Sequence, residues 1–122
     1  MIKMNYFGSF GSTEKTALDK LLPTVDHALG AHESGDYDSY LLIITHELSE
    51  KVSREGFEKA HTELFPYLGK LGSKTFLGSF KRGLNPMLLF AAKYANTEDD
   101  ILINVTFKNG TEPPLIDWLW IE

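Results

Sequence analysis

The chain has no cysteine among its 122 residues, and this absence excludes several kinds of protein. Without cysteine there is no disulfide framework, no thiolate nucleophile and no cysteine-ligated metal. The glycine signatures of phosphate-binding and dinucleotide-binding loops are missing as well, and so is the Gly-x-Ser-x-Gly motif of serine hydrolases. We therefore expect no cofactor.

Long hydrophobic runs and excess positive charge are also missing. The longest apolar runs, residues 41–44 and 87–92, are far shorter than the roughly 18 residues of a membrane span. Residues 1–10 lack the apolar core of a signal peptide, so we expect a cytoplasmic location, with export of a trimmed precursor left open. The 12 basic and 17 acidic residues give a net charge of −5, which disfavours nucleic acid and anionic membranes as partners.

What is present is the composition of one globular domain, 43% apolar and 24% charged. Gly-Ser pairs at positions 8–9 and 11–12 flank Phe10, and residues 1–11 show no periodicity, which predicts a loose N-terminal leader over residues 1–11. Residues 12–122 are expected to form a single domain.

Three stretches with helical spacing of apolar residues follow the leader. Their expected caps and stops are Ser12 or Thr13, Gly35, Asp36, Ser53 and Gly69. Pro23 is expected to kink or break the first helix, because proline removes one backbone donor. Residues 48–52 are expected to form a connector between the second helix and the third.

After Gly72 the apolar period changes from helical to two. Four strands are predicted, at residues 74–82, 87–95, 101–108 and 115–122, and the second is apolar on both sides and therefore central. Three helices followed by four consecutive strands predict an α+β fold with antiparallel meander pairing.

The last two strands are predicted to form a tight hairpin. Asn109-Gly110 is typical of a two-residue type I′ turn, which would place Ile103 opposite Ile116. The face expected to point inward, onto the helices, then consists of Ile101, Ile103, Val105, Ile116, Trp118 and Trp120. The outer face would carry Leu115, Leu119 and Ile121. Pro113 and Pro114 are expected to widen the hairpin near its tip, because they cannot donate to a strand ladder.

The order of elements and several short motifs resemble a bacterial family of unknown function within the nuclear-transport-factor-two-like, or cystatin-like, α+β rolls. The motifs are the stretches 34–37 (Ser-Gly-Asp-Tyr), 48–57 (Leu-Ser-Glu-Lys-Val-Ser-Arg-Glu-Gly-Phe) and 68–72 (Leu-Gly-Lys-Leu-Gly). The resemblance implies three N-terminal helices packed on a curved four-stranded antiparallel sheet. It also implies a frequent pocket between sheet and helices and frequent dimerisation through the outer sheet face.

The histidines are the first candidates for chemistry. Glu58 and His61 have the Glu-x-x-His spacing of carboxylate metal sites, but a second copy is missing, so no metal is expected. His46, with Glu47 or Asp117, has the chemistry of an acid–base pair. The simpler interpretation places His46 at the end of the second helix, where a cation suits the helix dipole.

Aromatic residues provide the second set of candidates. An apolar, aromatic cavity with a few polar groups is typical of small-molecule sites, although the same residues can simply pack a core. The candidate ligand-binding residues are Tyr37, Tyr40, His46, Tyr94, Trp118 and Trp120.

Three functions remain open on these grounds. The leading hypothesis is a non-catalytic homodimer that binds a small apolar ligand or a protein partner, dimerising through the outer sheet face. The alternative is a small isomerase or dehydratase that uses His46 as its general base. A purely structural interaction module without a cavity is the third.

Overall fold

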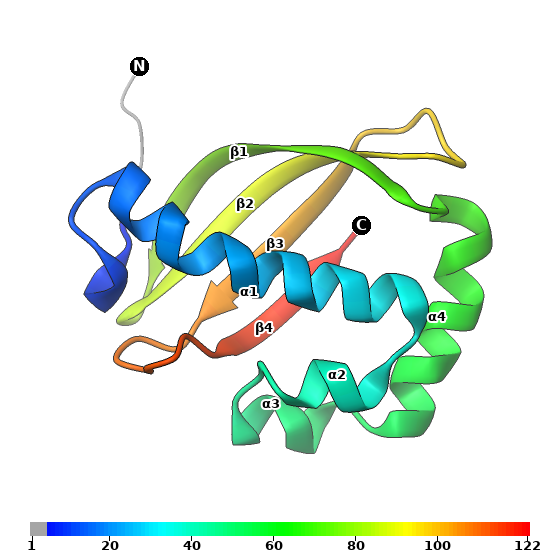
Figure 1. Cartoon of the computed structure of the whole chain (residues 1–122), viewed down its shortest axis with the longest axis horizontal. Coiled ribbons are helices and arrows are strands. Elements are labelled where there is room, and N and C mark those ends of the chain that lie inside the picture. The colour runs from blue at the N-terminus through cyan, green and yellow to red at the C-terminus, as the bar shows by residue number, and fades with distance from the viewer. Residues whose placement is uncertain (1–4) are drawn as a thin grey trace.

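The computed structural model describes residues 5–122, which form an α+β fold with all helices on one side of a single sheet (Figure 1). A short 3-10 helix, η1 (Gly8–Phe10), precedes four α-helices. These are α1 (Glu14–Ser34), α2 (Tyr37–Leu41), α3 (His46–Lys51) and α4 (Arg54–Leu68). The fold class predicted from the sequence is confirmed as α+β.

Local capping explains where the helices begin and end. The side chains of Thr13, Asp36, Thr45 and Ser53 each accept a hydrogen bond from a backbone N–H in the first turn. At Gly35 the chain leaves α1 with φ of 69°, and a Cβ there would lie 2.8 Å from the His61 ring. Glycine is therefore required by both the backbone conformation and the close approach of α4.

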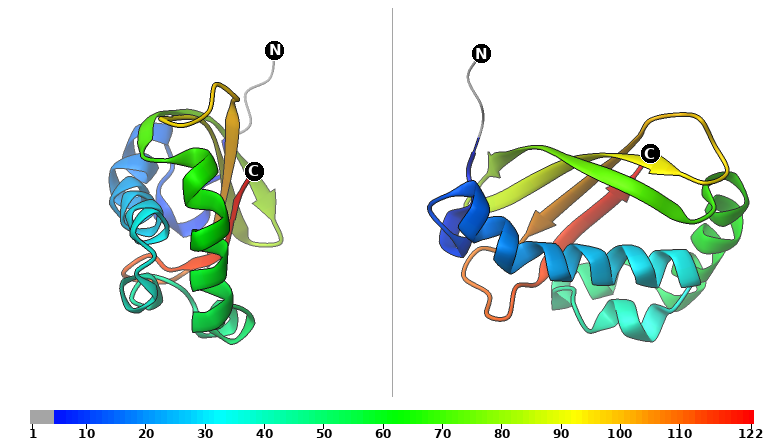
Figure 2. Two further views of the ribbon diagram at one scale, coloured as in Figure 1. Left: turned by 90° about the vertical axis from the view of Figure 1, so that its right-hand side faces the viewer. Right: turned by 45° about the horizontal axis from the view of Figure 1, so that its top comes forward.

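The sheet is an antiparallel meander with strand order β1-β2-β3-β4. Its strands are β1 (Leu71–Arg82), β2 (Asn85–Tyr94), β3 (Ile101–Phe107) and β4 (Ile116–Ile121). The sheet curves over α1, with α4 standing beside its β4 end (Figures 1 and 2). The concave face carries the core side chains Leu88, Phe90, Ile101, Ile103, Val105, Phe107 and Ile116, all buried against α1 and its neighbours.

The register of β3 and β4 differs from the tight hairpin expected. Ile103 pairs with Ile121 instead of Ile116, a slip of five residues, and Thr106 pairs with Trp118. The connection is wider than two residues, because Lys108 N–H donates to the Leu115 carbonyl and the two prolines between them cannot join a ladder. A turn does form at Asn109-Gly110, where Thr111 N–H donates to the Lys108 carbonyl at 3.3 Å, but Asn109 lacks the positive φ of a type I′ turn. The prediction of a tight two-residue hairpin is therefore wrong.

This slip places the tryptophans on the outside. An odd slip moves side chains to the opposite face of a sheet, and an irregularity at Asp117 lets Ile116 remain inside while the rest of β4 turns over. Trp118 is 43% exposed and Trp120 is 51% exposed, whereas Leu119 and Ile121 pack against the core. The predicted inward orientation of the indoles is therefore wrong, and so is the predicted outward orientation of Leu119 and Ile121.

The helical region differs in two further respects. Four α-helices are present instead of three, because Thr45 caps α3 over the stretch expected to be a connector. Pro23 lies inside α1 without dividing it. The predicted loose leader contains Phe7 and Phe10, which are buried in the core, while its residues 1–4 lie outside the described residues.

The observed register can be tested by comparing two alanine substitutions. Ile103→Ala should lower the free energy of unfolding by about 2–5 kcal/mol, because it leaves a cavity in the core. Trp120→Ala removes a larger side chain, yet it should cost less, since half of the indole already lies in solvent. Urea unfolding monitored by circular dichroism measures both. A greater loss for Trp120→Ala would contradict the register.

Candidate functional site

A cavity of about 450 Å³ lies between the helices and the strand β4. Its helical wall consists of His32, Tyr40, Leu48, Val52, Gly56, Phe57, Ala60, Glu63 and Leu64. Its sheet wall consists of Trp118, Leu119, Trp120 and Ile121. Most of these side chains are apolar or aromatic, and the volume is in the range of small-molecule sites.

The cavity exists because the segment before α3, residues 43–45, pairs with β4 only at the first residue of that strand. Ile116 N–H donates to the Ile43 carbonyl at 2.8 Å, and Thr45 N–H donates to the Ile116 carbonyl at 2.9 Å. The Thr45 hydroxyl then donates to Asp117 and accepts from Leu48 N–H, at 2.7 Å and 3.1 Å. These bonds start α3 and direct it away from the strand, so the remaining edge of β4 is left without a neighbouring strand.

Backbone groups of β4 are free along this edge. Leu102 and Glu122 exchange two hydrogen bonds, so in the alternating antiparallel pattern Trp118 and Trp120 also bond to β3. The N–H and C=O groups of Leu119 and Ile121 therefore point away from β3, toward the side of the cavity. They make no hydrogen bond with another residue of the described chain.

The inner end of the cavity is an aromatic cluster around His32. Its imidazole lies 4.9 Å from the Tyr40 ring and 4.8 Å from the Phe57 ring, measured between centroids. The His32 Nε2 atom is buried and has no hydrogen-bond partner, and the Tyr40 hydroxyl bonds to no residue in 5–122. One buried polar atom, the Nε2 of His32, is thus unpaired beside an apolar space.

Burial keeps His32 and Tyr40 uncharged. Burial, with a smaller contribution from the nearby His61, lowers the pKa of His32 from 6.5 to about 4. Burial also raises the pKa of Tyr40 well above its ordinary value, with Tyr37 contributing in the same direction. At neutral pH the inner end therefore presents a neutral imidazole and a neutral phenol.

A second, smaller cavity of about 30 Å³ lies behind His32, and its lining includes Glu33, His61 and Tyr94. This is room for about one water molecule. His61 Nδ1 donates to the His32 carbonyl at 2.9 Å, which ties α4 to the end of α1. Burial, followed by the effect of Glu33, raises the pKa of Tyr94 to about 12.

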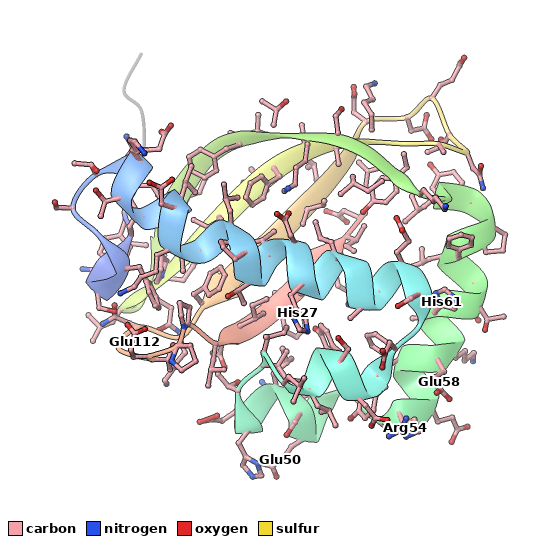
Figure 3. The ribbon with its side chains drawn as sticks, in the orientation of Figure 1. His27, Glu50, Arg54, Glu58, His61 and Glu112 are labelled. Atoms are coloured by element: carbon pink, nitrogen blue, oxygen red, sulfur yellow. The ribbon has the colours of Figure 1, made fainter. Side chains whose placement is uncertain are left out.

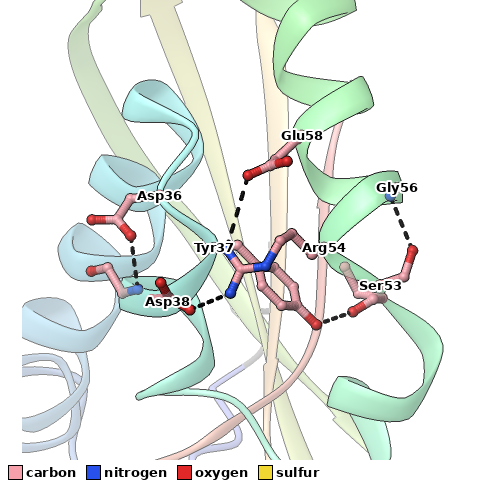
Figure 4. A network of polar contacts seen from close by, with 9 residues as sticks. Asp36, Tyr37, Asp38, Ser53, Arg54, Gly56 and Glu58 are labelled. Atoms are coloured by element: carbon pink, nitrogen blue, oxygen red, sulfur yellow. Dashed lines mark hydrogen bonds and ion pairs between the residues drawn. The ribbon is translucent and has the colours of Figure 1, made fainter.

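A polar network joins α2 to the start of α4 at the far end of the main cavity (Figure 4). Arg54 binds Asp38 and lies over the Tyr37 ring, 5.0 Å from its centroid. The Tyr37 hydroxyl donates to the Val52 carbonyl. Because Val52 and the first turns of α4 line the cavity, the network fixes one of its walls. The ion pair is exposed and contributes little to stability by itself.

The structure brings together only some of the predicted site residues. Tyr40, Trp118 and Trp120 line the main cavity, whereas Tyr94 lines the small one. Tyr37 is buried in the network below, and neither cavity includes it.

His46 lies outside both cavities. It begins α3 and does not end a helix, its side chain is 84% exposed, and it pairs with Glu50 at 3.2 Å. Figure 3 shows Glu50 on the outer surface of α3. The predicted location of His46 at the end of a helix and in the pocket is therefore wrong, because α3 starts at this residue and points it to solvent.

Sequence reasoning missed His32, Phe57 and Glu63 as lining residues. His32 continues the apolar stripe of α1 at helical spacing from Val25 and Ala28, both fully buried. That spacing was the available signal. A histidine in an apolar stripe faces the interior, and this one faces a cavity.

No cluster of three or more histidine, aspartate or glutamate side chains suited to a metal ion occurs within residues 5–122. Glu58 turns toward Arg54 on the surface, while His61 turns toward α1 (Figure 3). In the same stretch, no helix combines the length and the apolar character needed to cross a membrane.

A scan against protein-family models and searches of curated proteins and solved structures found no match to this chain. The site is therefore interpreted from its own geometry.

The burial of His32 predicts a measurable pH dependence. Its pKa is lower in the folded chain than in the unfolded one, so the unfolded state binds more protons between about pH 6.5 and 4. Stability should fall as the pH falls through this window, by on the order of 3 kcal/mol. His32→Phe should flatten the profile of unfolding free energy against pH. Parallel profiles for the two proteins, or an NMR titration of His32 near 6.5, would contradict the buried site.

Proposed function

We propose that this chain is a non-catalytic binding domain that holds a small, largely apolar molecule in the cavity between β4 and the helices. The observation that carries the proposal is the lining of the 450 Å³ space: apolar and aromatic side chains, with the unpaired Nε2 of His32 and the Tyr40 side chain as its polar points. In such sites the burial of apolar surface provides most of the affinity for the ligand, and a few polar groups fix the orientation of the ligand.

The lining does not favour the alternative of an isomerase or dehydratase that uses His46 as its base. A general base must lie within hydrogen-bond reach of the proton it removes, and His46 is on the surface with Glu50. His32 is inside, but no acid partner holds its ring nitrogens among the described residues. Ligand binding needs only the apolar lining and its polar points, whereas catalysis would need an acid partner for the histidine.

Filling the cavity should weaken binding. Ala60 lines the cavity from α4, so Ala60→Phe should reduce the affinity for the neutral fluorescent probe N-phenyl-1-naphthylamine by about tenfold or more. Lys59→Phe adds the same ring at the neighbouring exposed position and serves as the matched control. Fluorescence titration measures both variants. Equal affinities for Ala60→Phe, Lys59→Phe and the parent protein, or no binding by the parent, would refute the proposal.

A second part of the proposal is a homodimer through the outer sheet face. No helix within residues 5–122 covers this face, on which Leu77, Leu102, Trp118 and Trp120 are exposed. Trp118 and Trp120 have parallel rings, with centroids 6.4 Å apart. Exposed apolar surface commonly marks an interface, and a second copy of the chain would present the same apolar face.

The dimer is tested by placing a charge on the face. Leu102→Glu should shift a dimer to monomer in analytical ultracentrifugation, because a carboxylate would be buried in the interface. Leu84→Glu, at a leucine that is 66% exposed in the β1–β2 turn, should leave the dimer intact. A monomeric parent protein at high micromolar concentration would remove this part of the proposal and leave the cavity unaffected.

A further inference from the structure

The charges around the cavity restrict what it can hold. Among the described residues of its lining, Glu63 is the one carboxylate, and there is no lysine or arginine. An anionic ligand would have to give up its hydration without meeting a cation, which is costly in an apolar environment. Glu63 would add repulsion at α4.

Apart from Glu63, the polar groups of the lining are neutral. His32 is uncharged at neutral pH, so one ring nitrogen donates and the other accepts. The Tyr40 hydroxyl can do either, and the free N–H and C=O groups of Leu119 and Ile121 add one donor and one acceptor each. Because donors and acceptors alternate along a strand edge, the backbone dipoles of this wall largely cancel and bring no net charge to the cavity.

We infer that the cavity selects an uncharged molecule whose apolar body carries a hydroxyl, carbonyl or amide group, and that this group hydrogen-bonds to His32 and Tyr40. The inference rests on the proposed function and narrows its ligand class. The Nε2 of His32 lacks a partner and is closed off from solvent in the ligand-free structure, so a ligand group that reaches it offsets the cost of a buried polar group without a partner. The body of the molecule lies against Phe57, Leu64 and the β4 side of the cavity.

A matched set of naphthalenes tests this selection. Naphthalene, 2-naphthol and 2-naphthoate share one apolar body and differ in head group: none, neutral or anionic. Each is titrated at pH 7.5 against protein loaded with N-phenyl-1-naphthylamine, and displacement is read by fluorescence. We expect 2-naphthol to bind about tenfold more tightly than naphthalene or 2-naphthoate, since the neutral group is paired and the charge is excluded.

Two variants test whether His32 and Tyr40 make the hydrogen bonds to the hydroxyl group of 2-naphthol. Tyr40→Phe removes only a hydroxyl and His32→Phe removes the imidazole, and each should bring 2-naphthol close to the affinity of naphthalene. Tyr67→Phe is the control, because the Tyr67 hydroxyl donates to Asp99 on the surface, outside the cavity. An unchanged preference for 2-naphthol in both His32→Phe and Tyr40→Phe would overturn the assignment.

The outcomes separate this inference from the function on which it rests. If naphthalene displaces the probe but 2-naphthoate binds as tightly as 2-naphthol or more tightly, the selection is refuted and the binding function stands. If the probe and naphthalene both fail to bind, the binding function itself fails, and the selection fails with it.

Discussion

The short pairing of Ile116 with both of its neighbours is the constraint on which the rest of the structure depends. On one side Ile116 pairs with Phe107 of β3, and on the other it bonds to Ile43 and Thr45. Its side chain is fully buried, so its position cannot slide without opening the core. Beyond it the strand turns over at Asp117 and continues with its outer edge free.

Both candidate surfaces follow from this arrangement. Because α3 leaves the strand at Thr45, space remains between β4 and α4, and the aromatic cluster of His32, Tyr40 and Phe57 closes its inner end. Because β4 turns over, its two indoles lie on the uncovered face of the sheet and border the cavity. One edge strand thus serves as a wall of the binding site and as part of the outer face.

Local signals in the sequence predicted the local structure well. The caps at Thr13, Asp36 and Ser53 and the stops at Gly35 and Gly69 are where sequence reasoning placed them, since each depends on a few neighbouring residues. The register of β4 depends instead on its pairing with residues 43–45, about 70 residues earlier in the chain. It also depends on a five-residue shift against β3, which the alternation of apolar residues in the two strands does not reveal. At the site, Tyr40 lines the cavity, whereas His46 lies on the surface because α3 begins there. His32 continues the apolar stripe of α1 and was missed.

Residue-resolved amide hydrogen exchange along β4 tests the central claim most directly. If the edge is free and the register is as described, the amides of Trp118, Trp120 and Glu122 are protected by β3, whereas those of Leu119 and Ile121 exchange quickly. The account predicts this alternation in the ligand-free protein. Protection of Leu119 and Ile121 with rapid exchange at Trp118 and Trp120 would contradict it, and with it the origin of the cavity.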